Sequence, residues 1–187
     1  NNPSPTRAKV GDLITLSFTA SESLGALPTA SIAGHAASVS NVGGFAYTAS
    51  YTMAAGDSEG GVSFSISFSD VAGNAGAAVT STTDSSSVSF DKTAPVFSAT
   101  APASSSFVKD TKLSYTLSET LSSGSITWTR TSGTADASSP HAPALSAAEL
   151  AQGPHSNITL SSPPTLVDGT VYSISFNGSD LAGHPAS

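Results

Sequence analysis

Four acidic side chains stand where rows of alternating apolar residues end, and their positions suit the chemistry of cation binding. Glu22 and Asp70 each close such a row in the first half of the chain, and Glu119 and Asp180 do so in the second. Calcium accepts carboxylate oxygens in loose geometry, together with backbone carbonyls. Two carboxylates about 4 Å apart repel by about 4 kcal/mol at an effective dielectric of about 20. Such pairs therefore need a cation, a shared proton or hydrogen-bond donors.

A fifth candidate, Asp91, lies in the link between the two halves. In a seven-stranded sandwich the second and sixth strands end at the pole where the first strand begins, so their last residues meet. Glu22 is then expected beside Asp70, and Glu119 beside Asp180. Asp91 is expected to join the second pair at the entry of its domain. Calcium is the predicted ion, because magnesium demands a tighter octahedron.

The same acidic residues also open short glycine-containing motifs, which favours a purely structural interpretation. The two motifs are Asp70-Val-Ala-Gly-Asn74 and Asp180-Leu-Ala-Gly-His184. In a tight turn the Asp accepts hydrogen bonds from turn amides and the Gly supplies left-handed backbone. Glu22 could accept amide hydrogens of the same turn. His184 weakens the second motif as a calcium site, because hard cations prefer oxygen. Both interpretations stay open on the sequence.

These positions belong to two copies of one sequence pattern. The stretch Val10–Leu24 returns as Val108–Leu121, and Phe64–Asn74 returns as Tyr172–His184 at a larger separation. Two homologous units follow, expected at residues 1–91 and 92–187, with an insertion in the second at about 131–156. The second unit is also expected to lack its last strand, so we expect a longer parent protein.

Within each copy, apolar residues alternate with Ser or Thr, the period of strands with one buried face. The first unit is expected to form strands at Arg7–Val10, Leu13–Ala20, Ala30–Ala33, Ala37–Ser40, Phe45–Thr52, Gly61–Ser69 and Ala77–Phe90, the last of them broken near Asp84. The second is expected to form strands at Val96–Thr100, Lys112–Ser118, Ser125–Arg130, Asn157–Leu160 and Thr170–Asn177. The predicted fold is all-β: two tandem immunoglobulin-like sandwiches. In the insertion, Ser146-Ala-Ala-Glu149 has capping-box spacing and predicts one or two helical turns.

The aromatic side chains fall on the apolar phase of these strands and are expected to fill the core. Trp128 is predicted to be a packing residue of the third strand. This assignment leaves few rings for a platform that stacks sugars or bases. The core set is Phe18, Tyr47, Tyr51, Phe64, Phe68, Tyr115, Trp128, Tyr172 and Phe176.

The composition excludes several classes of function. Six Lys and Arg against 13 Asp and Glu give a formal charge of −7, which offers no footprint for nucleic acid or anionic lipid. No apolar run approaches the roughly 20 residues of a membrane span, and no membrane insertion is expected. Cysteine is absent, and the four histidines show no zinc-ligand spacing. No hydrolase elbow or phosphate-binding loop occurs, so the sequence predicts no enzyme.

The order of three motifs resembles bacterial immunoglobulin-like repeats of large secreted or surface-anchored proteins, including adhesins. The motifs are Ser-Glu22 after a strand, the turn Asp70–Asn74 and the linker Asp91-Lys-Thr-Ala-Pro95. The resemblance implies a non-catalytic stalk or adhesive fibre outside the cell, in which neighbouring repeats are the partners. In some members of the family, calcium stiffens the junctions between domains.

Two alternatives accompany this resemblance. The insertion could carry a recognition surface for a cell-surface glycan or protein, with His141, Glu149 and His155 at its edge. The chain could instead be an accessory domain of a multidomain hydrolase, whose catalytic sequence would lie elsewhere.

Overall fold

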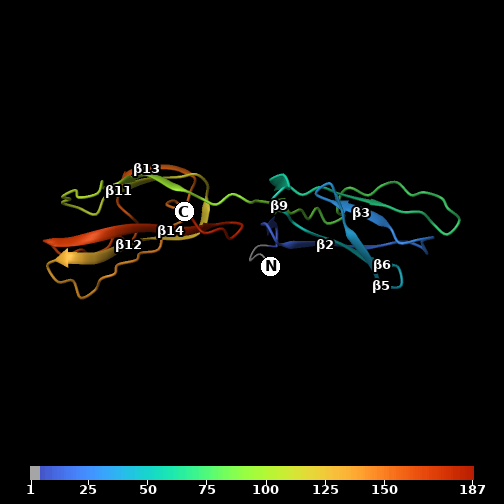
Figure 1. Cartoon of the computed structure of the whole chain (residues 1–187), viewed down its shortest axis with the longest axis horizontal. Helices are drawn as coiled ribbons and strands as arrows, with labels where there is room; N and C mark the ends of the chain where they lie inside the picture. The colour runs from blue at the N-terminus through green and yellow to red at the C-terminus, as the bar shows by residue number, and fades with distance from the viewer. Residues whose placement is uncertain (1–4) are drawn as a thin grey trace. The chain divides into compact units, whose positions relative to one another are not determined.

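The computed structural model describes residues 5–187, and this part of the chain is all-β (Figure 1). Strands, turns and irregular segments make up this range, without a helix. The chain divides into two compact units, Asn1–Lys92 and Thr93–Ser187. The division lies one residue beyond the boundary expected from the repeats. Residues 5–187 hold no helix long and apolar enough to cross a membrane.

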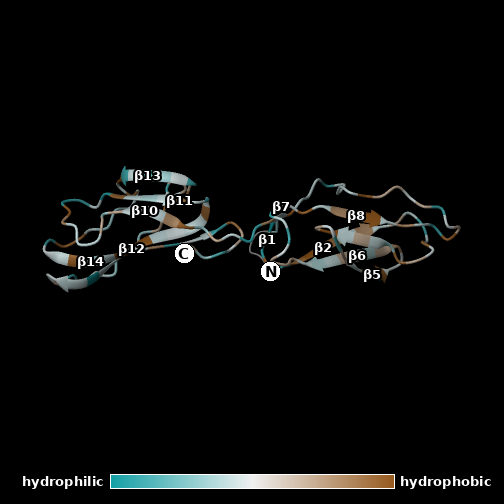
Figure 2. Cartoon of the chain, turned by 45° about the horizontal axis from the view of Figure 1, so that its top comes forward, coloured by the Kyte–Doolittle hydropathy of each residue, from teal (hydrophilic) through white to brown (hydrophobic). Residues whose placement is uncertain are grey.

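Unit 1 contains three small sheets with the strand orders β2-β6-β5, β4-β3-β8 and β1-β9-β7. Its strands are β1 (Arg7–Ala8), β2 (Leu13–Thr19), β3 (Thr29–Ile32), β4 (His35–Ala36), β5 (Ser38–Gly43), β6 (Ala46–Thr52), β7 (Gly60–Gly61), β8 (Phe64–Ser67) and β9 (Ser89–Phe90). The alternating rows act as predicted: Leu16 and Phe18 of β2 pack against a core that contains Ala49 and Ile66. Hydrophobic positions are interspersed with hydrophilic ones along the strands (Figure 2).

The strand predicted over Ala77–Phe90 is largely absent, but its expected break near Asp84 is confirmed. Only β9 forms there, together with a single bridge between Val79 and Ile66. The polar stretch in between turns on itself: Thr82 Oγ1 donates to the Ser86 carbonyl at 2.9 Å, and the Ser86 amide donates to Asp84 Oδ1 at 3.0 Å. Short polar side chains that bond nearby backbone compete with a sheet ladder, which explains the interruption.

Unit 2 contains a sheet of order β10-β11-β13 and a long pair, β12-β14. Its strands are β10 (Phe97–Ala101), β11 (Leu113–Leu117), β12 (Leu121–Gly133), β13 (Gly153–Ile158) and β14 (Thr170–Asp180). Tyr115, Ile126 and Trp128 lie at the centre of the core, and Trp128 is 3% exposed. The predicted packing role of this tryptophan is confirmed.

The short helix predicted in the insertion does not form. Ser146–Leu150 makes one isolated turn, in which the Leu150 amide donates to the Ser146 carbonyl at 3.0 Å. Gly153 then begins β13 in a left-handed conformation (φ 113°), which leaves no room for a second turn. A single helical turn fixes several dihedral angles for one hydrogen bond, so it does not propagate by itself.

The insertion is instead built into the sheets of unit 2. His141 and Trp128 exchange backbone hydrogen bonds of 2.8 and 3.0 Å, and Ala144 bridges Ser125. Leu145 is buried in the core that contains Trp128. The segment therefore belongs to the folded body of the unit.

Candidate functional site

Asp70 opens a five-residue turn that follows β8. Its Oδ1 accepts the Asn74 amide at 2.8 Å, and its Oδ2 accepts Asn74 Nδ2 at 2.7 Å. Gly73 has φ 90°, the left-handed conformation that the turn requires. The hydrogen bonds from Asn74 hold the pKa of Asp70 below its ordinary value. The predicted structural turn is thus confirmed.

Glu22 lies at the same end of unit 1 as this turn. Its side chain is exposed, and it lines a shallow hollow of about 460 Å³ together with Phe45 and Asp70. Both carboxylates offer oxygen, the ligand type that calcium prefers. Their role as cation ligands stays a prediction.

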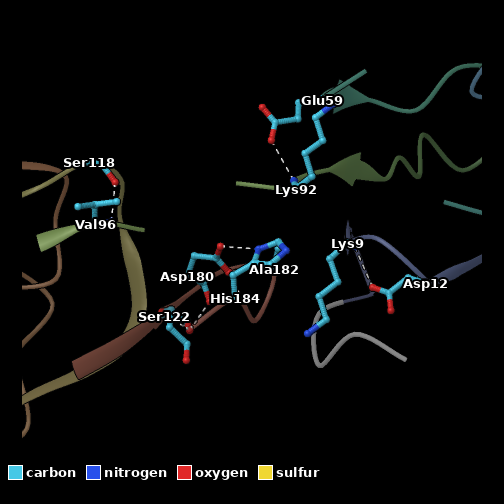
Figure 3. Close-up of polar contacts among 11 residues, drawn as sticks. Lys9, Asp12, Glu59, Lys92, Val96, Ser118, Ser122, Asp180, Ala182 and His184 are labelled. Atoms are coloured by element: carbon cyan, nitrogen blue, oxygen red, sulfur yellow. Dashed lines mark hydrogen bonds and ion pairs between the residues drawn. The ribbon is translucent and has the colours of Figure 1, made fainter. Parts of the chain in front are cut away.

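Asp180 repeats the same turn in unit 2 (Figure 3). Its Oδ1 accepts the Ala182 amide at 2.8 Å and the His184 amide at 2.9 Å, and Oδ2 lies 2.8 Å from His184 Nδ1. Because a carboxylate only accepts, Nδ1 carries the proton in this bond. His184 thus supplies the same side-chain N–H that Asn74 supplies in unit 1.

Asp180 is less accessible to a calcium ion than Asp70, because it is more deeply buried. The carboxyl side chain is 1% exposed, and three N–H groups already point at its two oxygens. A cation would have to displace at least one of these donors. A buried carboxylate requires partners for its charge, and these hydrogen bonds supply them without a metal ion.

The remaining predicted ligands lie near the ends of their units. Glu119 is half-buried and precedes β12 by two residues, and the first residue of β12, Leu121, pairs with Asp180. Asp91 belongs to unit 1, where its amide donates to the Ala8 carbonyl at 2.9 Å. The predicted joint site of Asp91, Glu119 and Asp180 involves both units and stays a prediction.

Two buried carboxylates that the sequence did not single out each bind a tyrosine and a histidine. In unit 1, Asp57 Oδ1 accepts Tyr51 Oη at 3.2 Å and lies 3.0 Å from His35 Nε2. The Ala54 amide, 2.8 Å from Asp57 Oδ2, is the main cause of the lowered pKa of Asp57. His35 stacks on Tyr51 with ring centroids 5.2 Å apart.

A similar group at other positions of unit 2 has shorter contacts. Asp136 Oδ2 accepts Tyr172 Oη at 2.6 Å and lies 2.6 Å from His141 Nε2. The bond from Tyr172, followed by that from His141, lowers the pKa of Asp136 to about 2. The carboxyl side chain is 3% exposed. Both groups tie separate segments together, and no short sequence motif marks them.

Replacing Asp136 by asparagine should reduce the acid sensitivity of unit 2. The folded-state pKa of about 2 lies below the ordinary 3.8, so the carboxylate stabilises the fold above about pH 4. That stabilisation is lost as the pH falls from about 4 to about 2. Urea unfolding of Asp136→Asn between pH 2 and 5 should show lower stability at pH 5 and a flatter profile. The exposed Asp168→Asn serves as control, and an unchanged profile in Asp136→Asn would contradict the assignment.

The three side chains proposed for a recognition surface are all engaged inside unit 2. Glu149 is 6% exposed, and its carboxylate accepts the Ser146 and Ser161 amides, each at 2.6 Å. Burial raises its pKa, but these hydrogen bonds outweigh burial and leave the pKa below its ordinary value. His155 bonds the Ala151 carbonyl, and its ring stacks on that of a buried tyrosine, 4.5 Å away. His141 bonds Asp136, as described above.

No protein-family model matches the chain, and a search of curated proteins finds no significant match. The functional argument therefore depends on the residues and their geometry.

Proposed function

We propose that the chain is a non-catalytic structural and adhesive module of a large bacterial protein outside the cell or at its surface. The module consists of two immunoglobulin-like sandwich repeats that follow one another in an end-to-end stalk. Neighbouring repeats of the same protein are its partners.

The observation that carries this proposal is the recurrence of one turn at one place in both units. Asp70 bridges Leu24 in unit 1, and Asp180 pairs with Leu121 in unit 2. Each Asp binds the amide and a side-chain N–H of the fourth residue after it. Two copies of one turn on matching strands support a repeat architecture.

The strand pairing supports the sandwich assignment. In unit 1, β2 pairs β6 while β3 pairs β8 in a separate sheet; in unit 2, β11 pairs β13 while β12 pairs β14. An immunoglobulin-like sandwich likewise places its second and fifth strands in one sheet and its third and sixth in the other.

Mechanical stretching tests the proposal. A stalk of independent repeats should unfold in two separate steps when the chain is pulled from its ends. One cooperative step for the whole chain would contradict it.

A separate part of the proposal is that Glu22 and Asp70 bind calcium. Melting of the chain with calcium and with a chelator tests it, because free ligand at about 100 times its Kd stabilises by about 2.7 kcal/mol. Unit 1 should melt at a higher temperature with calcium, and Glu22→Gln should abolish the gain. Magnesium serves as the control ion. A melting temperature that calcium does not change would contradict the metal site and leave the structural role intact.

A further inference from the structure

Unit 1 ends at Lys92, and this residue is fastened to one loop of its own unit. Its backbone amide donates to Glu59 Oε1 at 3.0 Å (Figure 3). Its ammonium group donates to the Ala55 carbonyl at 3.2 Å and to the Asp57 carbonyl at 2.8 Å. These partners come 33 to 37 residues earlier in the chain. The loop 54–59 therefore holds both the main chain and the side chain of Lys92.

The turn that receives the ammonium group is itself held in place. The Asp57 carboxylate accepts the Ala54 amide at 2.8 Å, and the Asp57 amide donates to the Ala54 carbonyl at 3.0 Å. The Asp57 side chain is buried and also bonds Tyr51 and His35. Because the turn is closed in this way, the carbonyls of Ala55 and Asp57 form a preformed acceptor site for one ammonium group. Hydrogen bonds from a charged donor are the stronger kind.

Unit 2 is also fastened where it begins. The Pro95 carbonyl accepts the Ser187 amide at 3.0 Å, and the proline is fully buried. Proline fixes its own φ and biases the residue before it toward extended backbone. Two residues, Thr93 and Ala94, separate Pro95 from Lys92. Any bending of the chain between these two fastened positions must occur within that short segment.

The contacts of Lys92 serve local order more than the core of unit 1. Lys92 and Glu59 are both exposed, and exposed polar contacts contribute little to the stability of a whole domain. They act instead on the end of the unit, where a chain frays unless it is tied down.

We propose that Lys92 is a clamp that fixes the direction in which the chain leaves unit 1 and thereby limits bending between the two units. The Asp57 turn holds its side chain, and Glu59 holds its backbone. The clamp deepens the stalk role proposed above and rests on it, because it assigns the stiffness of the link to one residue and its acceptor site.

The test uses the full chain with two spin labels, attached to Thr52→Cys in unit 1 and Ala148→Cys in unit 2. Both positions are exposed, and the chain has no other cysteine. Pulsed electron–electron double resonance gives the distribution of distances between the labels. Adding Lys92→Met together with Glu59→Ala should widen this distribution roughly twofold or more, because the end of unit 1 is released and lengthens the flexible link.

A matched control removes the same kinds of side chain elsewhere. Lys109→Met together with Asp110→Ala lies in an exposed loop of unit 2 and should leave the width of the distribution unchanged. Lys92→Met alone should widen the distribution by an intermediate amount, because Glu59 still holds the backbone amide. Urea unfolding of unit 1 should change little in either Lys92 variant.

Three results would overturn the clamp. They are an unchanged width in the double variant, a labelled parent already as broad as that variant, and unfolding of unit 1 as a whole under much milder conditions, which would make Lys92 a stabilising contact of the fold. The stretching experiment proposed above is independent of these measurements. A single unfolding step there would contradict the stalk, whereas an unchanged width here overturns the clamp alone.

Discussion

Replacing Asp180 by alanine should unfold unit 2 under much milder conditions and leave unit 1 unchanged. The substitution removes the acceptor of the Ala182 and His184 amides and of His184 Nδ1. Each buried polar group left without a partner costs about 1–3 kcal/mol, so the total loss should reach roughly 3 kcal/mol or more. Urea unfolding with a probe in each unit, Trp128 fluorescence for unit 2, measures the two transitions separately.

The matched control is Asp70→Ala in unit 1. Asp70 holds the same turn, but it is only half-buried, and its partners in Asn74 can turn to water. We expect a loss of about 1 kcal/mol there, the size of an ordinary hydrogen bond. Equal losses in the two variants would show that burial does not set the strength of the turn.

Replacing Glu149 by alanine should also destabilise unit 2 strongly, by about 2–4 kcal/mol. The carboxylate is 6% exposed and fastens the Ser146 turn to Ser161 through two amides and the Ser161 hydroxyl. Without it, two buried or partly buried N–H groups lose a charged acceptor, which is the stronger kind of hydrogen bond. Thermal unfolding measures the loss, and the neighbouring exposed Ala148→Ser should be neutral.

This variant also separates the structural role of the insertion from a recognition role. A glycan or protein surface built on Glu149 would lose its ligand while the stability of unit 2 stayed unchanged, and that result would contradict our account. Deletion of the insertion cannot make this distinction. It would also remove Leu145 from the core and His141 from its bridge to Trp128.

The sequence was sufficient to predict the structure wherever one local pattern determined it. The alternation in β2 placed Leu16 and Phe18 inward, and the Asp-x-Ala-Gly spacing predicted the turns at Asp70 and Asp180. No helix forms at Ser146, because too few residues separate the capping box from Gly153 for a helix to propagate.

The carboxylate groups at Asp57 and Asp136 could not be found in this way. Asp57 meets His35 from a distant segment, and Asp136 meets Tyr172 from β14. Such contacts depend on how separate strands pack, which periodicity does not encode. The only available signal for these groups was the low content of charged residues. When a chain with few carboxylates buries several of them, each one needs a hydrogen-bond partner.

The most direct test of the repeat-module account is single-molecule stretching of the full chain between its two ends. We expect two separate unfolding steps, each releasing roughly 300 Å of chain at about 3.3–3.6 Å per residue for units of this length. In Asp180→Ala, one of the two steps should move to lower force while the other keeps its force. A single step releasing roughly twice that length, or a shift of both steps in the variant, would contradict two independent repeats.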